Sequence, residues 1–208
     1  GAAPAWEDSA GGLTGKQEGT NFVQSLKIGN TTTGTLDNAY SNVGIGIDTL
    51  EAITSGDNNT AVGRRSGQDI TSGVANTFIG NDAGMNVTTA TKNTAVGSNA
   101  LSTATTTTAS DSNTAVGYFT LNAAIGGYAN TAVGDRAGTA VSGGDYNILL
   151  GFTAGANITT GSGNVIIGDI DADAVDSART LKIAGNDGST LTTWISGDSS
   201  GNLTFPAN

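Results

Sequence analysis

A short pattern of polar and apolar positions recurs through the middle of the chain. Each copy reads Asn, two variable residues, an aliphatic residue and Gly, as in segment 59–63, Asn-Thr-Ala-Val-Gly. Six of the seven intervals between copies are 17 residues and the other is 20. A fixed period is the sequence signature of a repeat architecture. The residues that open the copies are Asn42, Asn59, Asn76, Asn93, Asn113, Asn130, Asn147 and Asn164.

The repeat extends beyond the Gly that closes each copy. A small residue follows three positions later, as in Ser66, and Gly or Leu comes next, as in Gly67. Seven positions after the Gly stands an aliphatic residue or Ala, as in Ile70. A three-residue insertion in the Thr/Ser-rich segment 104–112 accounts for the longer interval. The closing glycines are Gly46, Gly63, Gly80, Gly97, Gly117, Gly134, Gly151 and Gly168.

The period and the residue types predict an all-β fold. Seventeen residues are too few for a helical repeat, and β-branched residues bounded by Gly and Asn favour short strands. We therefore predict a parallel β-solenoid of about eight 17-residue coils, with short β caps at both ends. A coil this small cannot bury its apolar face alone and depends on its neighbours.

The alternation of side chains along each strand predicts two packed faces. The fourth position of the motif is always aliphatic, as in Ile45 and Val62, and we interpret it as the buried face. The third position is Ala in four copies, for example Ala61, and we expect this second face to pack against other copies of the chain. A homo-oligomer with cyclic symmetry follows.

The recurring Asn and Gly are most simply structural. Gly permits a positive φ or a close approach at the corner after each strand, and Asn suits a turn or a stacked amide ladder. A ligand-binding row of Asn side chains is the alternative.

The flanks of the repeat divide the chain further. We expect an extended arm over residues 1–20, an N-terminal β cap over 21–41, the solenoid over 42–170, and a C-terminal cap and hairpin over 171–208. Leu-Lys-Ile stands in both flanks, at residues 26–28 and 181–183, which suggests capping strands. Trp6 and Trp194 lie near opposite ends, where caps or docking contacts need large apolar anchors.

The repeat over residues 42–168 resembles the head repeats of YadA-like trimeric autotransporter adhesins, although the adhesin period is usually shorter. The motif Asn-Thr-Ala-Val-Gly is more similar to phage tail-fibre shafts, as are the flanking segments "LKIGN", "TLKIAGNDGSTLTTW" and "SGDSSGNLTFP". The resemblance implies a homotrimeric fibre segment and names no receptor.

Composition excludes several kinds of chemistry. The chain has no His and no Cys, so it offers no Ser-His-Asp triad, Cys nucleophile or thiolate-bound metal. A net charge of −10 argues against nucleic acid as a partner, and no apolar run is long enough for membrane insertion. The chain starts at Gly1 without Met, so we expect a processed product or a fragment.

A few residues could still carry chemistry. Asp169, Asp171, Asp173 and Asp176 have a spacing similar to a calcium loop, although Ala174 stands where such a loop requires Gly, and a solvated acidic loop is the simpler interpretation. The carboxylates Glu7, Glu18 and Glu51 are too scattered to favour glycoside hydrolysis. Arg64-Arg65 is the one basic doublet, interpreted as a solvated corner.

Together these features predict a structural fibre or adhesion module without catalysis or cofactor, on a virion appendage or in the extracellular, cell-surface space. Its expected partners are copies of itself and a host-surface glycan or protein, met at the inserted loop 104–112. A secreted filament or matrix subunit that polymerises end to end is the alternative. Ice binding and glycan processing are further alternatives; Thr94, Thr114 and Thr131 recur, but on the face interpreted as core.

Overall fold

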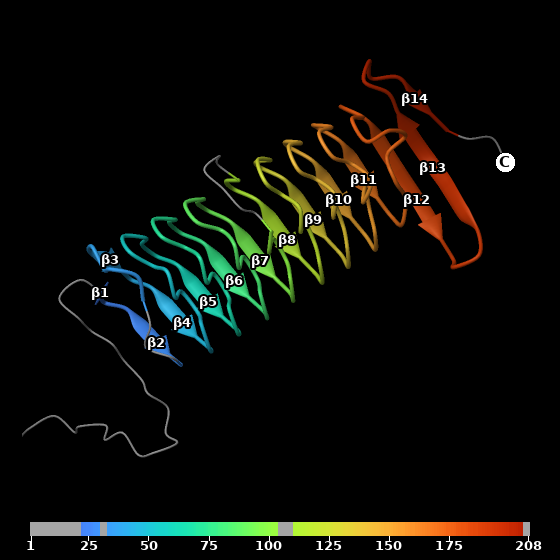
Figure 1. The fold of residues 1–208 in the computed structure, drawn as a ribbon. Helices are drawn as coiled ribbons and strands as arrows, with labels where there is room; N and C mark the ends of the chain where they lie inside the picture. Colours follow the sequence, from blue (N-terminus) through green and yellow to red (C-terminus); the bar gives the residue numbers. More distant parts are fainter. Residues whose placement is uncertain (1–21, 30–32, 104–109, 206–208) are drawn as a thin grey trace, which may run out of the picture.

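The computed structural model describes residues 22–29, 33–103 and 110–205. The chain climbs through stacked coils in one direction, and each coil contributes one strand to a single long sheet (Figure 1). The described residues contain strands and turns only. The predicted arm at residues 1–20 and most of the predicted loop at 104–112 lie outside these ranges.

The strands of the repeat are three residues long, and longer strands occur only near the C-terminal end. The twelve-stranded sheet has the order β14-β13-β12-β11-β10-β9-β8-β7-β6-β5-β4-β2, and β1 pairs with β3 in a separate two-stranded sheet. The bounds are β1 Phe22–Val23, β2 Leu26–Ile28, β3 Ala39–Tyr40, β4 Val43–Ile45, β5 Thr60–Val62, β6 Thr77–Ile79, β7 Thr94–Val96, β8 Thr114–Val116, β9 Thr131–Val133, β10 Ile148–Leu150, β11 Val165–Ile167, β12 Leu181–Asn186, β13 Leu191–Gly197 and β14 Leu203–Thr204.

The strands from β2 to β12 are parallel and in register, and their nine successive pairings define about nine coils. Equivalent positions of the repeat meet across every pairing, including the one that spans the insertion, where Ala95 pairs with Ala115. The parallel β-solenoid predicted from the period is confirmed.

The solenoid is longer than the sequence analysis placed it. Strand β2 pairs with β4, so that Lys27 faces Gly44, and β12 pairs with β11, so that Lys182 faces Ile166. The two Leu-Lys-Ile segments are therefore the first and last coils of the stack rather than separate caps. After β12 the chain reverses into the antiparallel strands β13 and β14, which form the predicted hairpin.

The glycine that closes each motif is required by both conformation and contact. From Gly46 to Gly151 its φ lies between 132° and 139°, a region that L side chains rarely adopt. A Cβ on Gly134 would lie 2.1 Å from the carbonyl oxygen of Gly151 in the next coil. The corners thus stack backbone on backbone, and no side chain fits between them.

The two faces of each strand have the opposite roles to those predicted. The third position is completely buried, as for Ala61 and Phe78, whereas the fourth is partly exposed, at 38% for Ile45 and 40% for Ile79. The interpretation of the aliphatic column as core was wrong, because the third position points into the coil and the fourth position therefore lies on the opposite, outer face. The small residue after the corner and the aliphatic residue seven positions after the Gly, such as Ser66 and Ile70, complete the interior.

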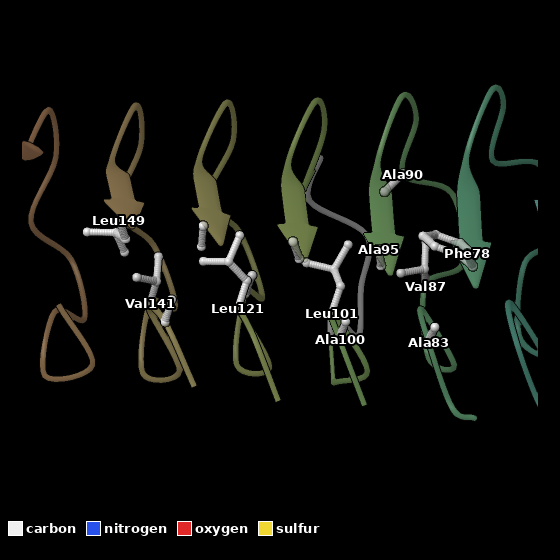
Figure 2. Close-up of a cluster of buried hydrophobic side chains, with 14 of the residues drawn as sticks. Phe78, Ala83, Val87, Ala90, Ala95, Ala100, Leu101, Leu121, Val141 and Leu149 are labelled. Atoms are coloured by element: carbon white, nitrogen blue, oxygen red, sulfur yellow. The ribbon is translucent and has the colours of Figure 1, made fainter. Parts of the chain in front are cut away.

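Large and small residues complement one another inside the solenoid, so that its narrow interior stays filled (Figure 2). Gly67 and Gly138 leave room where neighbouring coils supply large side chains. A Cβ on Gly67 would approach both Phe78 and Leu50, and one on Gly138 would approach both Leu149 and Leu121. Where the same position carries Leu121, the residue keeps a positive φ of 46° and its side chain fills the interior itself.

We predict that Gly138→Ala destabilises the fold. The new methyl group would lie 2.7 Å from Leu149 Cδ1 at a φ of 60°, so overpacking and backbone strain together should lower the free energy of unfolding by about 2–4 kcal/mol. Gly143→Ala is the control, because its nearest neighbour is 3.9 Å away. Denaturant unfolding of both variants measures the difference, and equal losses would contradict this packing.

Candidate functional site

The repeated Asn side chains form an amide ladder inside the stack. The Oδ1 of Asn130 accepts hydrogen bonds from the backbone N–H and the Nδ2 of Asn147, each at 3.0 Å. The Nδ2 of Asn130 donates to the carbonyl of Gly144 at 2.8 Å and to Oδ1 of Asn113 at 3.1 Å. All eight Asn residues are completely buried. Their hydrogen bonding is thus consumed by the stack, which leaves no row of amides for a ligand.

Hydroxyl residues close both ends of this ladder. Ser25 Oγ accepts from the backbone N–H of Asn42 at 2.8 Å. At the other end, the N–H and hydroxyl of Thr180 donate to Oδ1 of Asn164 at 3.1 and 2.7 Å. Ser25 and Thr180 occupy the Asn position of the first and last coils, so the ladder ends where the parallel stack ends.

The outer face of the sheet is the most extensive candidate surface. The register places the fourth positions of ten successive parallel strands, and Ile195 of β13 beyond them, in one unbroken apolar column. We call this the outer column. It consists of Ile28, Ile45, Val62, Ile79, Val96, Val116, Val133, Leu150, Ile167, Ile183 and Ile195.

A second column runs beside it on the same face. Its middle is five threonines, Thr60, Thr77, Thr94, Thr114 and Thr131, and its ends are aliphatic, for example Val43 and Ile148. Neither column contains a charged residue, although the chain carries 26 charged residues in all (8 basic and 18 acidic). The threonines share a face with the aliphatic column as predicted, but that face points outward and leaves them half-buried.

The charged residues gather at the corners instead. Arg65 Nε and Nη2 donate to both carboxylate oxygens of Asp82 in the next coil, at 2.7 and 2.6 Å. The guanidinium of Arg136 lies 5.4 Å from the ring centroid of Tyr118. One half of the basic doublet Arg64-Arg65 is therefore a paired, structural residue rather than a solvated one.

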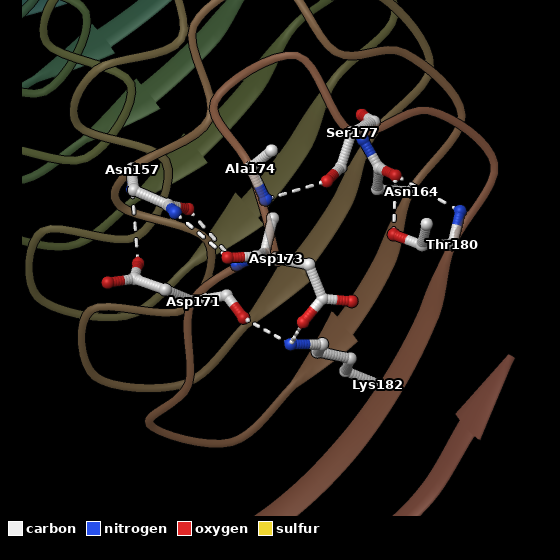
Figure 3. A network of polar contacts seen from close by, with 9 residues as sticks. Asn157, Asn164, Asp171, Asp173, Ala174, Ser177, Thr180 and Lys182 are labelled. Carbon is white, nitrogen blue, oxygen red and sulfur yellow. Dashed lines mark hydrogen bonds and ion pairs between the residues drawn. The ribbon is translucent and has the colours of Figure 1, made fainter. Parts of the chain in front are cut away.

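The acidic loop after β11 does not assemble a cation site (Figure 3). The carboxylate of Asp171 accepts from the backbone N–H of Asn157 at 3.1 Å, and Lys182 Nζ donates to the Asp171 carbonyl and to the Asp173 carboxylate. Asp169 accepts from Asn186 Nδ2 at 2.6 Å. In three of the calcium candidates, Asp169, Asp171 and Asp173, the carboxylate oxygens accept hydrogen bonds from an ammonium group or amide donors, and the four residues are not grouped as a metal site.

The other sequence candidates do not converge on a catalytic site. Within residues 22–29, 33–103 and 110–205 no three acidic side chains are placed to hold a metal ion, and no helix could cross a membrane. Glu51 accepts from Gln68 Nε2 at 2.6 Å, and Glu7 and Glu18 lie outside these ranges.

A buried lysine in the first coil escaped the sequence analysis. Lys27 stands at the inward third position and is only 3% exposed. Burial lowers its pKa to about 8, while the charges of Glu51 and Asp48 oppose this shift. The period did indicate that this segment is a coil with Lys27 at its third position, because Ile28 and Gly29 stand 17 residues before Ile45 and Gly46.

Comparison with models of known protein families, with curated proteins and with solved structures gave no match in any of the three.

We predict that Asn130→Ala costs about 3–5 kcal/mol of unfolding free energy, because it leaves the buried N–H of Asn147 and the Gly144 carbonyl without these partners. Asn81→Ala, at an exposed corner, should change the free energy by less than about 0.5 kcal/mol. Denaturant unfolding measures both, and a mild effect at Asn130 would show that the ladder contributes little.

We predict that stability rises with pH above about 8. The folded-state pKa of Lys27 is lower than its unfolded value of 10.5, so the unfolded chain binds more protons in this window and each rise in pH favours the folded state. Melting temperatures recorded from pH 7.5 to 9.5 should rise more steeply for the wild type than for Lys27→Met. Melting temperatures that rise equally with pH in the wild type and in Lys27→Met would show that Lys27 does not cause the effect.

Proposed function

We propose that this chain is a segment of an extracellular fibre, on a virion appendage or a cell surface, and that its copies associate side by side through the outer face. The observation that carries the proposal is the unbroken outer column, which leaves large aliphatic side chains such as Ile45 and Ile79 more than a third exposed. Contiguous exposed apolar surface of this extent marks an interaction site.

The shape of the surface favours copies of the chain as the partner. A straight column along the stacking direction matches an identical column on a parallel copy, because equivalent residues then lie at the same height. The absence of charge from both columns means that self-association brings no like charges together. Exposed corner charges such as the Arg136–Asp135 pair stay in solvent.

We propose three copies around an axis parallel to the solenoid. Cyclic symmetry closes the assembly, so that every copy covers its column without leaving an open end. The repeat's resemblance to tail-fibre shafts and adhesin heads supports the same number. Nine steps of about 4.8 Å give a rod segment about 43 Å long.

The adhesive surface in this proposal is the corners. These carry exposed aromatic residues, among them Tyr118, Tyr146 and Phe152, beside charged residues such as Asp135. Aromatic and charged side chains on turns of a rigid scaffold are suited to binding a host-surface glycan or protein.

Two other functions make different predictions for the same face. An end-to-end filament would leave the outer column exposed and grow with concentration. Ice binding gains support from the five threonines on the outer face, which form an evenly spaced array with Val62, Val96 and their equivalents. Ice binding needs that face free, so a monomer that shows thermal hysteresis would select it over the fibre.

We predict that the native mass, measured by light scattering, is three times 20.5 kDa, or about 61.5 kDa. Val116→Asp places a charge in the centre of the outer column and should reduce the mass to that of one chain. Asn81→Asp adds the same charge at an exposed corner and should leave the trimer intact. Circular dichroism establishes that both variants remain folded.

A single-chain mass for the folded wild type at micromolar concentration would reject the proposal. A mass that grows continuously with concentration would select the end-to-end filament.

A further inference from the structure

An irregularity in β13 turns a tryptophan toward the outer face. Ile183 pairs with Ile195, but the next pair is Ala184 with Thr193, so Trp194 is the extra residue of a β-bulge. Bulges re-aim side chains, and this one places Trp194 and Ile195 on the same face. Trp194 is 57% exposed.

Gly185 supplies the position over which this ring lies. In β12, residue 185 follows Ile183 by two and therefore shares its outward face. A Cβ on Gly185 would lie 2.5 Å from Cζ2 of Trp194. The indole thus lies against the backbone of β12 on the outer face, where Gly leaves room for it.

The end of the sheet adds other apolar residues around the tryptophan. Leu181, Gly197 and Leu203 are paired across β12, β13 and β14, and a Cβ on Gly197 would contact both leucine side chains. The outer column continues through Ile183 and Ile195. We call the outward side of β12–β14 the tail face. It contains Leu181, Ile183, Trp194, Ile195 and Leu203.

The area of the outer column is too small for a stable contact by itself. Two columns about 10 Å wide along about 43 Å of strands cover about 430 Å², whereas a standard interface takes about 800 Å² from each partner. Strands β13 and β14 of the tail face, about 24 Å long and about 4.8 Å apart, add at most about 230 Å². The two surfaces together approach the size that a specific complex needs.

We infer that Trp194 is the anchor of the contact between copies, and that the tail face of a second copy covers it. This inference rests on the proposed function, since it names the residue on which the side-by-side association depends most. In a parallel assembly the tail faces of all copies lie at the same height, so the second copy presents an equally apolar surface to the ring. Tryptophan side chains that become buried in this way dominate the binding energy of interfaces.

The test uses the full chain and a dilution series followed by light scattering. Trp194→Ala should raise the concentration at which the assembly dissociates by at least about 30-fold, the effect of losing one hot-spot residue. Phe152→Ala removes a corner aromatic of similar exposure, 54%, and should leave dissociation unchanged. An assembly that dissociates equally in both variants would overturn the inference.

The outcomes separate this inference from the proposed function. If Val116→Asp breaks the trimer while Trp194→Ala behaves like wild type, the fibre stands and the anchor is elsewhere on the outer face. A Trp6→Phe background leaves Trp194 as the sole tryptophan, whose fluorescence is excited selectively over that of the four tyrosines. Its emission should shift to longer wavelength on dilution through dissociation, and emission that stays constant through dissociation would reject its burial between copies.

Discussion

The structure depends on stacking equivalent corners of successive coils directly on one another. After each strand the Gly backbone lies against the carbonyl of the next Gly, and before each strand one buried Asn side chain bridges its neighbours above and below. Both contacts require equivalent residues at the same place in every coil. This requirement explains why the motif keeps its Asn and Gly while the residues between them vary, and why the insertion near residue 104 changes the length of one coil without shifting the register.

The stacking also determines what each face of the sheet can do. The interior of each tight coil has room for Ala, or for one large residue where Gly stands opposite. The core is therefore stabilised by contacts between successive coils more than by contacts within one coil. The aliphatic side chains of the fourth position cannot enter that interior and form the outer column. The solenoid therefore satisfies its Asn hydrogen bonds internally and presents an uncharged, partly exposed apolar face outward.

The solenoid could be predicted from the sequence because a fixed period determines how successive coils stack. The spacing of Asn42 through Asn164 predicted coil length, parallel pairing and the solenoid correctly. The choice of buried face failed at residues such as Ile45 and Val62, because strand alternation identifies two faces but not which of them is inside. An invariant aliphatic residue is expected both in a core and at a surface that other copies cover.

Other features depend on contacts distant in the sequence. The first coil was assigned to a cap because Leu-Lys-Ile recurs in both flanks, although Ile28 and Gly29 keep the period. The acidic segment 169–176 has the spacing of a metal loop, and only the position of Lys182 shows how its oxygens are used. The bulge at Trp194 follows from a hairpin register that no local pattern specifies.

The most direct test of the account is the chemical accessibility of the outer column in the assembled protein. The chain has no Cys, so Val116→Cys and Asn81→Cys each introduce one thiol at a chosen place. If copies cover the outer column, Cys at 116 should react with an alkylating reagent at least about tenfold more slowly than Cys at 81, and the difference should narrow on dilution to single chains, in which position 116 is half-buried and position 81 exposed. Equal reaction rates in the undiluted native protein would contradict the account.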